Sequence, residues 1–127
     1  MNLEKVIFGF FIILAMTLNF TFVFGEIEDP AHHNFIEFFF VVVVNIIATT
    51  LKVGDRTQIG AVLLATSLVA NLQLIAAAAI WTNAVHISGT GLDTESLALI
   101  VSHAAGALIA NIVSVTMFVA ETLMLRR

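Results

Sequence analysis

Four long apolar stretches constrain the fold of this chain more than any other feature of its sequence. They extend over about residues 6–25, 30–52, 57–83 and 95–125. A helix of ~20 apolar residues crosses the ~30 Å hydrocarbon layer of a bilayer. Only 11% of the 127 residues are charged, whereas soluble domains contain roughly 25%. The sequence therefore predicts an all-α membrane protein, with residues 1–127 forming a single membrane domain of four antiparallel transmembrane helices.

The first stretch has a rival interpretation as a cleavable signal peptide. Its apolar run is longer than the ~7–15 residues of a signal-peptide core, and it ends at Phe24-Gly25-Glu26 without a small-x-small cleavage site. We therefore expect a retained helix. The start of the second helix is marked by Asp29, which suits an N-cap, and by Pro30, which suits the first helical position.

The basic residues predict how the four helices are oriented. If successive helices alternate in direction, every lysine and arginine falls on one side of the membrane: Lys5, Lys52, Arg56, Arg126 and Arg127. The positive-inside rule assigns this side to the cytoplasm. Trp81 falls at the other end, where interfacial aromatic residues occur. We expect both termini to be cytoplasmic.

Each predicted helix carries one asparagine at membrane depth, where polar groups are costly. These residues are Asn19, Asn45, Asn71 and Asn111. Amides of this kind either hydrogen-bond between helices and fix their packing, or line a path for ions or water near the midplane. The sequence leaves both alternatives open.

Two ionisable residues, Glu37 and His103, lie in the outer half of the predicted bundle. A contact between them is plausible and makes this pair the best candidate for a functional site. Glu121 is 18 residues after His103, which is five full turns, so both project in the same direction. Together with Asn45, Asn71 and Asn111, these residues form the candidate ion or proton path. The alternative is that His103 is a packing residue and Glu121 lies at the cytoplasmic interface beside the final arginines.

The fourth helix also carries small residues at every fourth position: Ser102, Gly106, Ala110 and Ser114. This small-xxx-small pattern predicts close contact with a neighbouring helix.

Other functional classes receive little support from the sequence. The absence of cysteine excludes disulfides and thiolate chemistry. His33 and His86 are weak candidates for a metal site, and His32 and His33 are adjacent and point in different directions on a helix. We found no catalytic motif and no basic run for nucleic acid. We therefore expect no enzymatic activity and no cofactor.

Residues 52–65 contain one local similarity to a known family. Gly54, Asp55, Arg56 and Thr57 resemble the Gly-Asp-Lys-Thr motif of membrane calcium/manganese cation–proton exchangers. Lys52 stands where that family has its metal-binding glutamate. The same residues also fit a tight cytoplasmic turn with an N-cap from Asp55 or Thr57.

The chain as a whole resembles the small, uncharacterised bacterial inner-membrane protein families of four helices, which implies a location in the bacterial inner membrane. Two functional hypotheses follow. The first is an ion or proton channel or transporter, homo-oligomeric because four short helices can hardly enclose a pore. The second is a non-catalytic accessory or scaffold subunit of a larger membrane complex.

Overall fold

The computed structural model describes residues 3–24, 35–54, 57–89, 91 and 93–125. Its elements are the helices α1 (Leu3–Phe24), α2 (Phe35–Val53), α3 (Gln58–Thr82) and α4 (Thr94–Leu125), together with the π-helix η2 (Asn83–Ile87), which continues α3. Each of the four α-helices is long and apolar enough to cross a membrane. The prediction of an all-helical protein with four such helices is confirmed.

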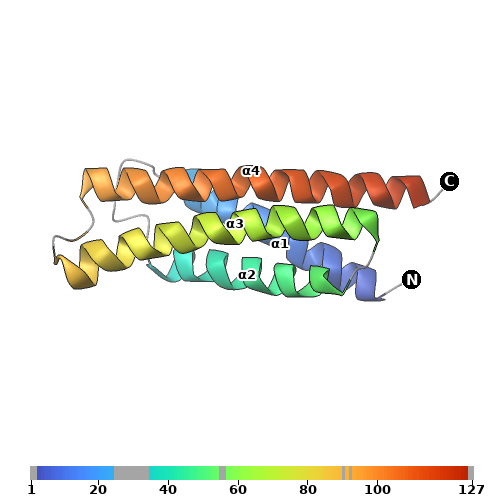
Figure 1. Ribbon diagram of the computed structural model, residues 1–127, viewed down its shortest axis with the longest axis horizontal. Coiled ribbons are helices and arrows are strands. Elements are labelled where there is room, and N and C mark those ends of the chain that lie inside the picture. Colours follow the sequence, from blue (N-terminus) through green and yellow to red (C-terminus); the bar gives the residue numbers. More distant parts are fainter. Residues whose placement is uncertain (1–2, 25–34, 55–56, 90, 92, 126–127) are drawn as a thin grey trace.

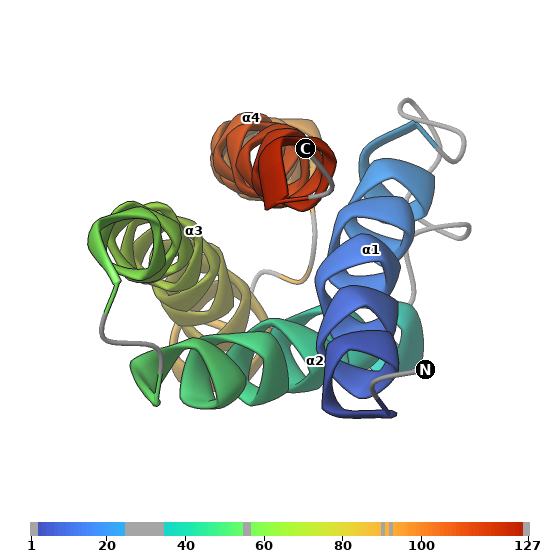
Figure 2. The same ribbon diagram turned by 90° about the vertical axis from the view of Figure 1, so that its right-hand side faces the viewer.

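The helices pack in a ring in which each contacts the next along the chain and α4 also contacts α1. The contact between α3 and α4 is the most extensive, and these two helices lie side by side along the molecule (Figure 1). Seen along the long axis, α1 and α2 are inclined to them (Figure 2). Lys5 in α1 forms an ion pair with Glu121 in α4. We call the end of the molecule that holds this pair the terminal end.

Side-chain caps determine where α3 and α4 begin. The Thr57 hydroxyl accepts a hydrogen bond of 2.9 Å from the backbone N–H of Gly60, and the alternative cap Asp55 lies outside the described residues. Asp93 Oδ1 accepts a 2.7 Å hydrogen bond from the backbone N–H of Ser96 at the start of α4. This bond stabilises the carboxylate and holds the pKa of Asp93 below its usual value.

The half of the bundle away from the terminal end is filled by an aromatic cluster of Phe22, Phe38 and Trp81. Phe38 stacks on Trp81 with ring centroids 5.3 Å apart, and Phe22 lies at the same distance, 5.3 Å, from Phe38. The position of Trp81 near the end of α3 suggests an interfacial aromatic residue, but its side chain is only 6% exposed and points into the bundle. The aromatic cluster therefore closes this half of the interior.

Small residues bring α3 and α4 together. A Cβ atom added to Gly106 of α4 would lie 3.2 Å from Gln73 Cδ of α3. Ala110 and Ser114 are buried, whereas Ser102 is exposed. Of the four small residues, Gly106, Ala110 and Ser114 therefore lie on the packed side of α4, and Ser102 does not.

Candidate functional site: a buried lysine in a polar interior

The most unusual polar residue in the bundle is Lys52, near the end of α2, which is only 1% exposed. Its Nζ donates hydrogen bonds to Ser67 Oγ of α3 and, at 2.5 Å, to Ser114 Oγ of α4. Both serines are buried as well. We call Lys52, Ser67 and Ser114 the lysine site. The positive-inside rule favours a basic anchor facing water at residue 52, but the side chain turns into the bundle.

The lysine site lies well inside the helices that surround it. Ser114 precedes Glu121 by seven residues, or about 10 Å along α4. Ser67 follows the first residue of α3 by nine residues, or about 14 Å. A side chain on a helix slants toward the N-terminus of that helix, and for Lys52 this direction leads away from the terminal end. The ammonium group therefore reaches deeper than its place in the sequence suggests.

Among the described residues, the partners of the Lys52 ammonium group are neutral hydroxyl groups. No carboxylate in the described part of the chain lies within ion-pair distance of Nζ, and the ion pair of Lys5 with Glu121 is separate from it. Removing an ammonium ion from water costs several kcal/mol, and lysines within membranes usually have a compensating partner. In the part of the chain that the structure describes, the lysine site is thus a positive centre without a carboxylate partner.

The spacing of Lys52 and Ser114 from the membrane-depth asparagines is a sequence signal for this site. Lys52 follows Asn45 by seven residues, which is two helical turns, so both lie on one face of α2. Ser114 likewise follows Asn111 by one turn on α4. The face of α2 on which Asn45 predicts a polar interior therefore also carries Lys52.

Three of the four membrane-depth asparagines meet in the structure. Asn111 Nδ2 donates to Asn45 Oδ1 at 3.0 Å. With the Asn19 amide oriented to satisfy its neighbours, Asn111 Nδ2 also donates to Asn19 Oδ1 at 3.0 Å. We call Asn19, Asn45 and Asn111 the asparagine triad. All three are buried, and they join α1, α2 and α4.

The amide protons of the triad are used within the protein. Asn45 Nδ2 donates to the Val41 carbonyl at 2.7 Å, and in the same orientation Asn19 Nδ2 donates to the Ala104 carbonyl at 3.0 Å. The bonds of Asn19 and Asn111 join neighbouring helices, whereas that of Asn45 to Val41 lies within α2. An ion would have to displace these groups in order to pass.

The other polar residues predicted at membrane depth form separate pairs. Asn71 Nδ2 donates to Thr49 Oγ1 at 2.7 Å, linking α3 to α2. His103 Nδ1 lies 2.7 Å from Gln73 Oε1, so the structure puts Gln73 where Glu37 was expected. Glu37 lies in the first turn of α2 and is half-buried.

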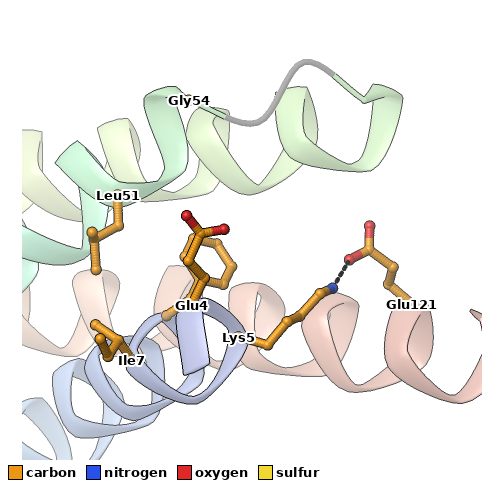
Figure 3. Close-up of a pocket in the computed structure, with 7 residues that line it drawn as sticks. Glu4, Lys5, Ile7, Leu51, Gly54 and Glu121 are labelled. Carbon is orange, nitrogen blue, oxygen red and sulfur yellow. Dashed lines mark hydrogen bonds and ion pairs between the residues drawn. The ribbon is translucent and has the colours of Figure 1, made fainter. Parts of the chain in front are cut away.

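Glu121 contributes to a pocket at the terminal end. Its Oε1 lies 3.4 Å from Lys5 Nζ, whereas the expected neighbours Arg126 and Arg127 lie outside the described residues. The pocket has a volume of about 470 Å³ and is lined by Glu4, Lys5, Ile7, Phe8, Leu51, Gly54 and Glu121. In Figure 3, Lys5 points toward Glu121 and Glu4 points toward the end of α2. Leu51 and Gly54 lie one residue before and two residues after Lys52 in the chain.

Of the two weak metal candidates, the structure describes only His86. His86 is exposed in η2, while His33 lies outside those residues, as do Asp55 and Arg56 of the exchanger-like segment. In the ranges that the structure describes, no three histidine, aspartate or glutamate side chains are placed to hold one metal ion.

Comparison with known proteins gives one result. A family model described as "Family of unknown function (DUF6394)" matches residues 32–122, a range that contains α2, α3, α4 and the whole lysine site. No curated protein and no solved structure matches the chain. The match agrees with the expectation of a small, uncharacterised protein family. It does not support the similarity of residues 52–65 to cation–proton exchangers.

Proposed function

Since the chain belongs to the DUF6394 family of unknown function, we propose its role from the lysine site: it is a small ion transporter of the membrane. The protein crosses the bacterial inner membrane four times as an antiparallel bundle, with both termini in the cytoplasm. The distribution of all five basic residues supports this orientation. We propose neither a catalytic activity nor a cofactor for the protein.

The observation that carries this proposal is the buried charge of Lys52. Hydrogen bonds between transmembrane helices are worth ~0.6–1.7 kcal/mol, and the asparagine triad provides such bonds without a net charge. A lysine costs ~2.5–3.5 kcal/mol at the centre of a transmembrane helix on insertion scales and less near the helix end, where Lys52 lies. Its burial in the bundle nevertheless removes the ammonium group from water, at a cost of several kcal/mol. Packing alone therefore gives no reason for a charge at this position, whereas binding an ion does.

The surroundings of the lysine site favour a transporter over a permanently open channel. The terminal pocket lies at the same end of the bundle as Lys52. Toward the other end, the asparagine triad and the aromatic cluster fill the interior. A site of this kind is reached from one side at a time, and passage across the membrane requires the helices to rearrange.

We also propose that the protein assembles with further copies of itself in the bilayer. Many large apolar side chains point outward, among them Phe10, Phe39, Leu72 and Ile109, and these face either lipid or another copy. The mass of the purified protein in detergent solution tests this part of the proposal, and a monomeric mass contradicts it.

Flux into liposomes tests the transport function. We expect purified protein to carry ions across vesicle membranes in assays with a panel of salts and a pH-sensitive dye. Lys52→Met should abolish this flux, because it removes the charge and keeps an unbranched apolar chain. Arg127→Met, which removes one positive charge at the sequence terminus, is the matched control and should retain it.

Two further variants show how far the path extends. If Glu37→Gln and His103→Ala also abolish flux in protein that still assembles, the path includes the outer half of the bundle. If they retain flux, it depends on the lysine site alone. Flux no greater than that of empty vesicles for every ion refutes the transport function.

The asparagine triad favours a second candidate function, that of a non-catalytic accessory or scaffold subunit. Its amide protons join three helices instead of facing an open path. For this role we expect variants of the triad to lose assembly or a co-purifying membrane partner, with no intrinsic flux in liposomes.

A further inference from the structure

The lysine site keeps free hydrogen-bond donors. An ammonium group has three N–H donors, and two of those on Lys52 go to Ser67 and Ser114. The third has no acceptor among the described residues. Each serine oxygen accepts from Nζ and keeps its own hydroxyl proton to donate. Thr66 Oγ1 lies 3.2 Å from Ser114 Oγ, and its hydroxyl also donates to the Leu63 carbonyl at 2.9 Å.

No carboxylate of the described residues pairs with these donors. On α4, the nearest acidic residue of the described chain is Glu121, about 10 Å from Ser114 along the helix and paired with Lys5. One helical turn from each member of the lysine site lies a buried apolar residue (Ala48, Leu63 and Ala110) and also a polar one (Thr49, Asn71 and Asn111). A charge in this water-poor interior attracts an ion of opposite sign more strongly than it would in bulk water.

We infer that the lysine site binds a small monovalent anion of the halide type, for which chloride is the probe. One ammonium group neutralises one negative charge, and a second charge on the ligand would stay unpaired in hydrocarbon. None of the three side chains of the site is more than 3% exposed, so a single-atom ion requires less displacement of neighbouring side chains than a polyatomic one. This inference rests on the proposed function and names the class of ion that is carried.

The distribution of charge along the sequence supports the approach of an anion from the terminal side. In the proposed orientation, that side carries all five basic residues and three acidic ones, whereas the other side carries six acidic residues and no lysine or arginine. An alkali cation is disfavoured, because it would have to share the hydroxyl oxygens with the Lys52 ammonium group at 2.5 Å from one of them.

Chloride binding can be measured on the full chain in detergent, independently of transport. The chloride concentration is varied by replacing sodium chloride with sodium gluconate. We expect the protein to broaden the chlorine NMR line, and this excess broadening to saturate at millimolar chloride. Bromide should compete for the site and reverse the broadening. Lys52→Met should abolish it, and the double variant Ser67→Ala/Ser114→Ala should weaken binding tenfold or more, because it removes two hydrogen bonds to a charged ligand.

Two controls are matched to these variants. Arg127→Met removes the same charge as Lys52→Met, and Ser102→Ala makes the same change as Ser114→Ala at an exposed position of α4. Both should bind chloride within twofold of the unchanged protein. If Lys52→Met fails to fold, the serine variant and the unchanged protein still decide the question.

The inference is overturned if the unchanged protein gives no saturable broadening, if Lys52→Met retains it, or if sodium competes for the site. Its failure can be distinguished from failure of the transport function. Chloride binding without flux supports the site and refutes transport, whereas cation flux without chloride binding refutes the anion site and supports transport.

Discussion

Asn111 lies where three helices meet, and replacing it measures how strongly the asparagine triad holds the bundle. Its Nδ2 donates to Asn45 Oδ1 at 3.0 Å and to Asn19 Oδ1, also at 3.0 Å. In Asn111→Leu both bonds are lost, and two buried oxygens lose a donor. At ~0.6–1.7 kcal/mol for each interhelical bond, we expect the free energy of unfolding to fall by about 1–3 kcal/mol.

Reversible unfolding in mixed micelles of dodecyl sulfate and a mild detergent, followed by circular dichroism, gives this free energy. Asn71→Leu is the control, because it removes a single bond, that to Thr49, and should cost about half as much. Replacing the whole triad by leucine should recover part of the loss, because no buried amide then lacks a partner. An Asn111→Leu protein as stable as the unchanged one refutes the structural role of the triad.

Two other features give predictions of the same kind. Gly106→Ile should lower the free energy of unfolding by ~1–3 kcal/mol, because its side chain meets Gln73; unchanged stability would contradict the close approach of α3 and α4. Trp81, the single tryptophan, should emit at short wavelength and resist quenching by acrylamide, and Phe38→Ala should shift the emission to the red, because the indole loses its stacking partner. Emission and quenching like those of free tryptophan would contradict a closed aromatic cluster.

The existence of four membrane-capable helices could be predicted because it depends on local properties. Runs of apolar residues set the spans, and Thr57, one of two caps suggested by the sequence, does cap α3. Which polar side chains meet depends instead on how each helix is rotated about its axis. Asn71 resembles the other three asparagines in sequence, yet it bonds to Thr49 and not to the triad.

The burial of Lys52 likewise could not be predicted from the sequence. A rule that counts basic residues near helix ends predicts the side of the membrane, but it contains no information on where a long side chain points. The burial of Lys52 depends on α3 and α4, whose serines lie 15 and 62 residues away in the chain. For His103, the sequence analysis suggested Glu37 as the partner, whereas the packing of α3 on α4 brings Gln73 to it.

The dominant share of α4 in the polar contacts has a consequence for biosynthesis. This helix supplies Asn111, Ser114, His103 and Glu121 to residues of the three helices that precede it. Because α4 leaves the ribosome after α1 to α3, those helices enter the membrane while these partners are still missing. The amide groups and the lysine must then be accommodated by water or by the insertion machinery, and a nascent chain that stalls before α4 is expected to be a substrate for membrane proteases.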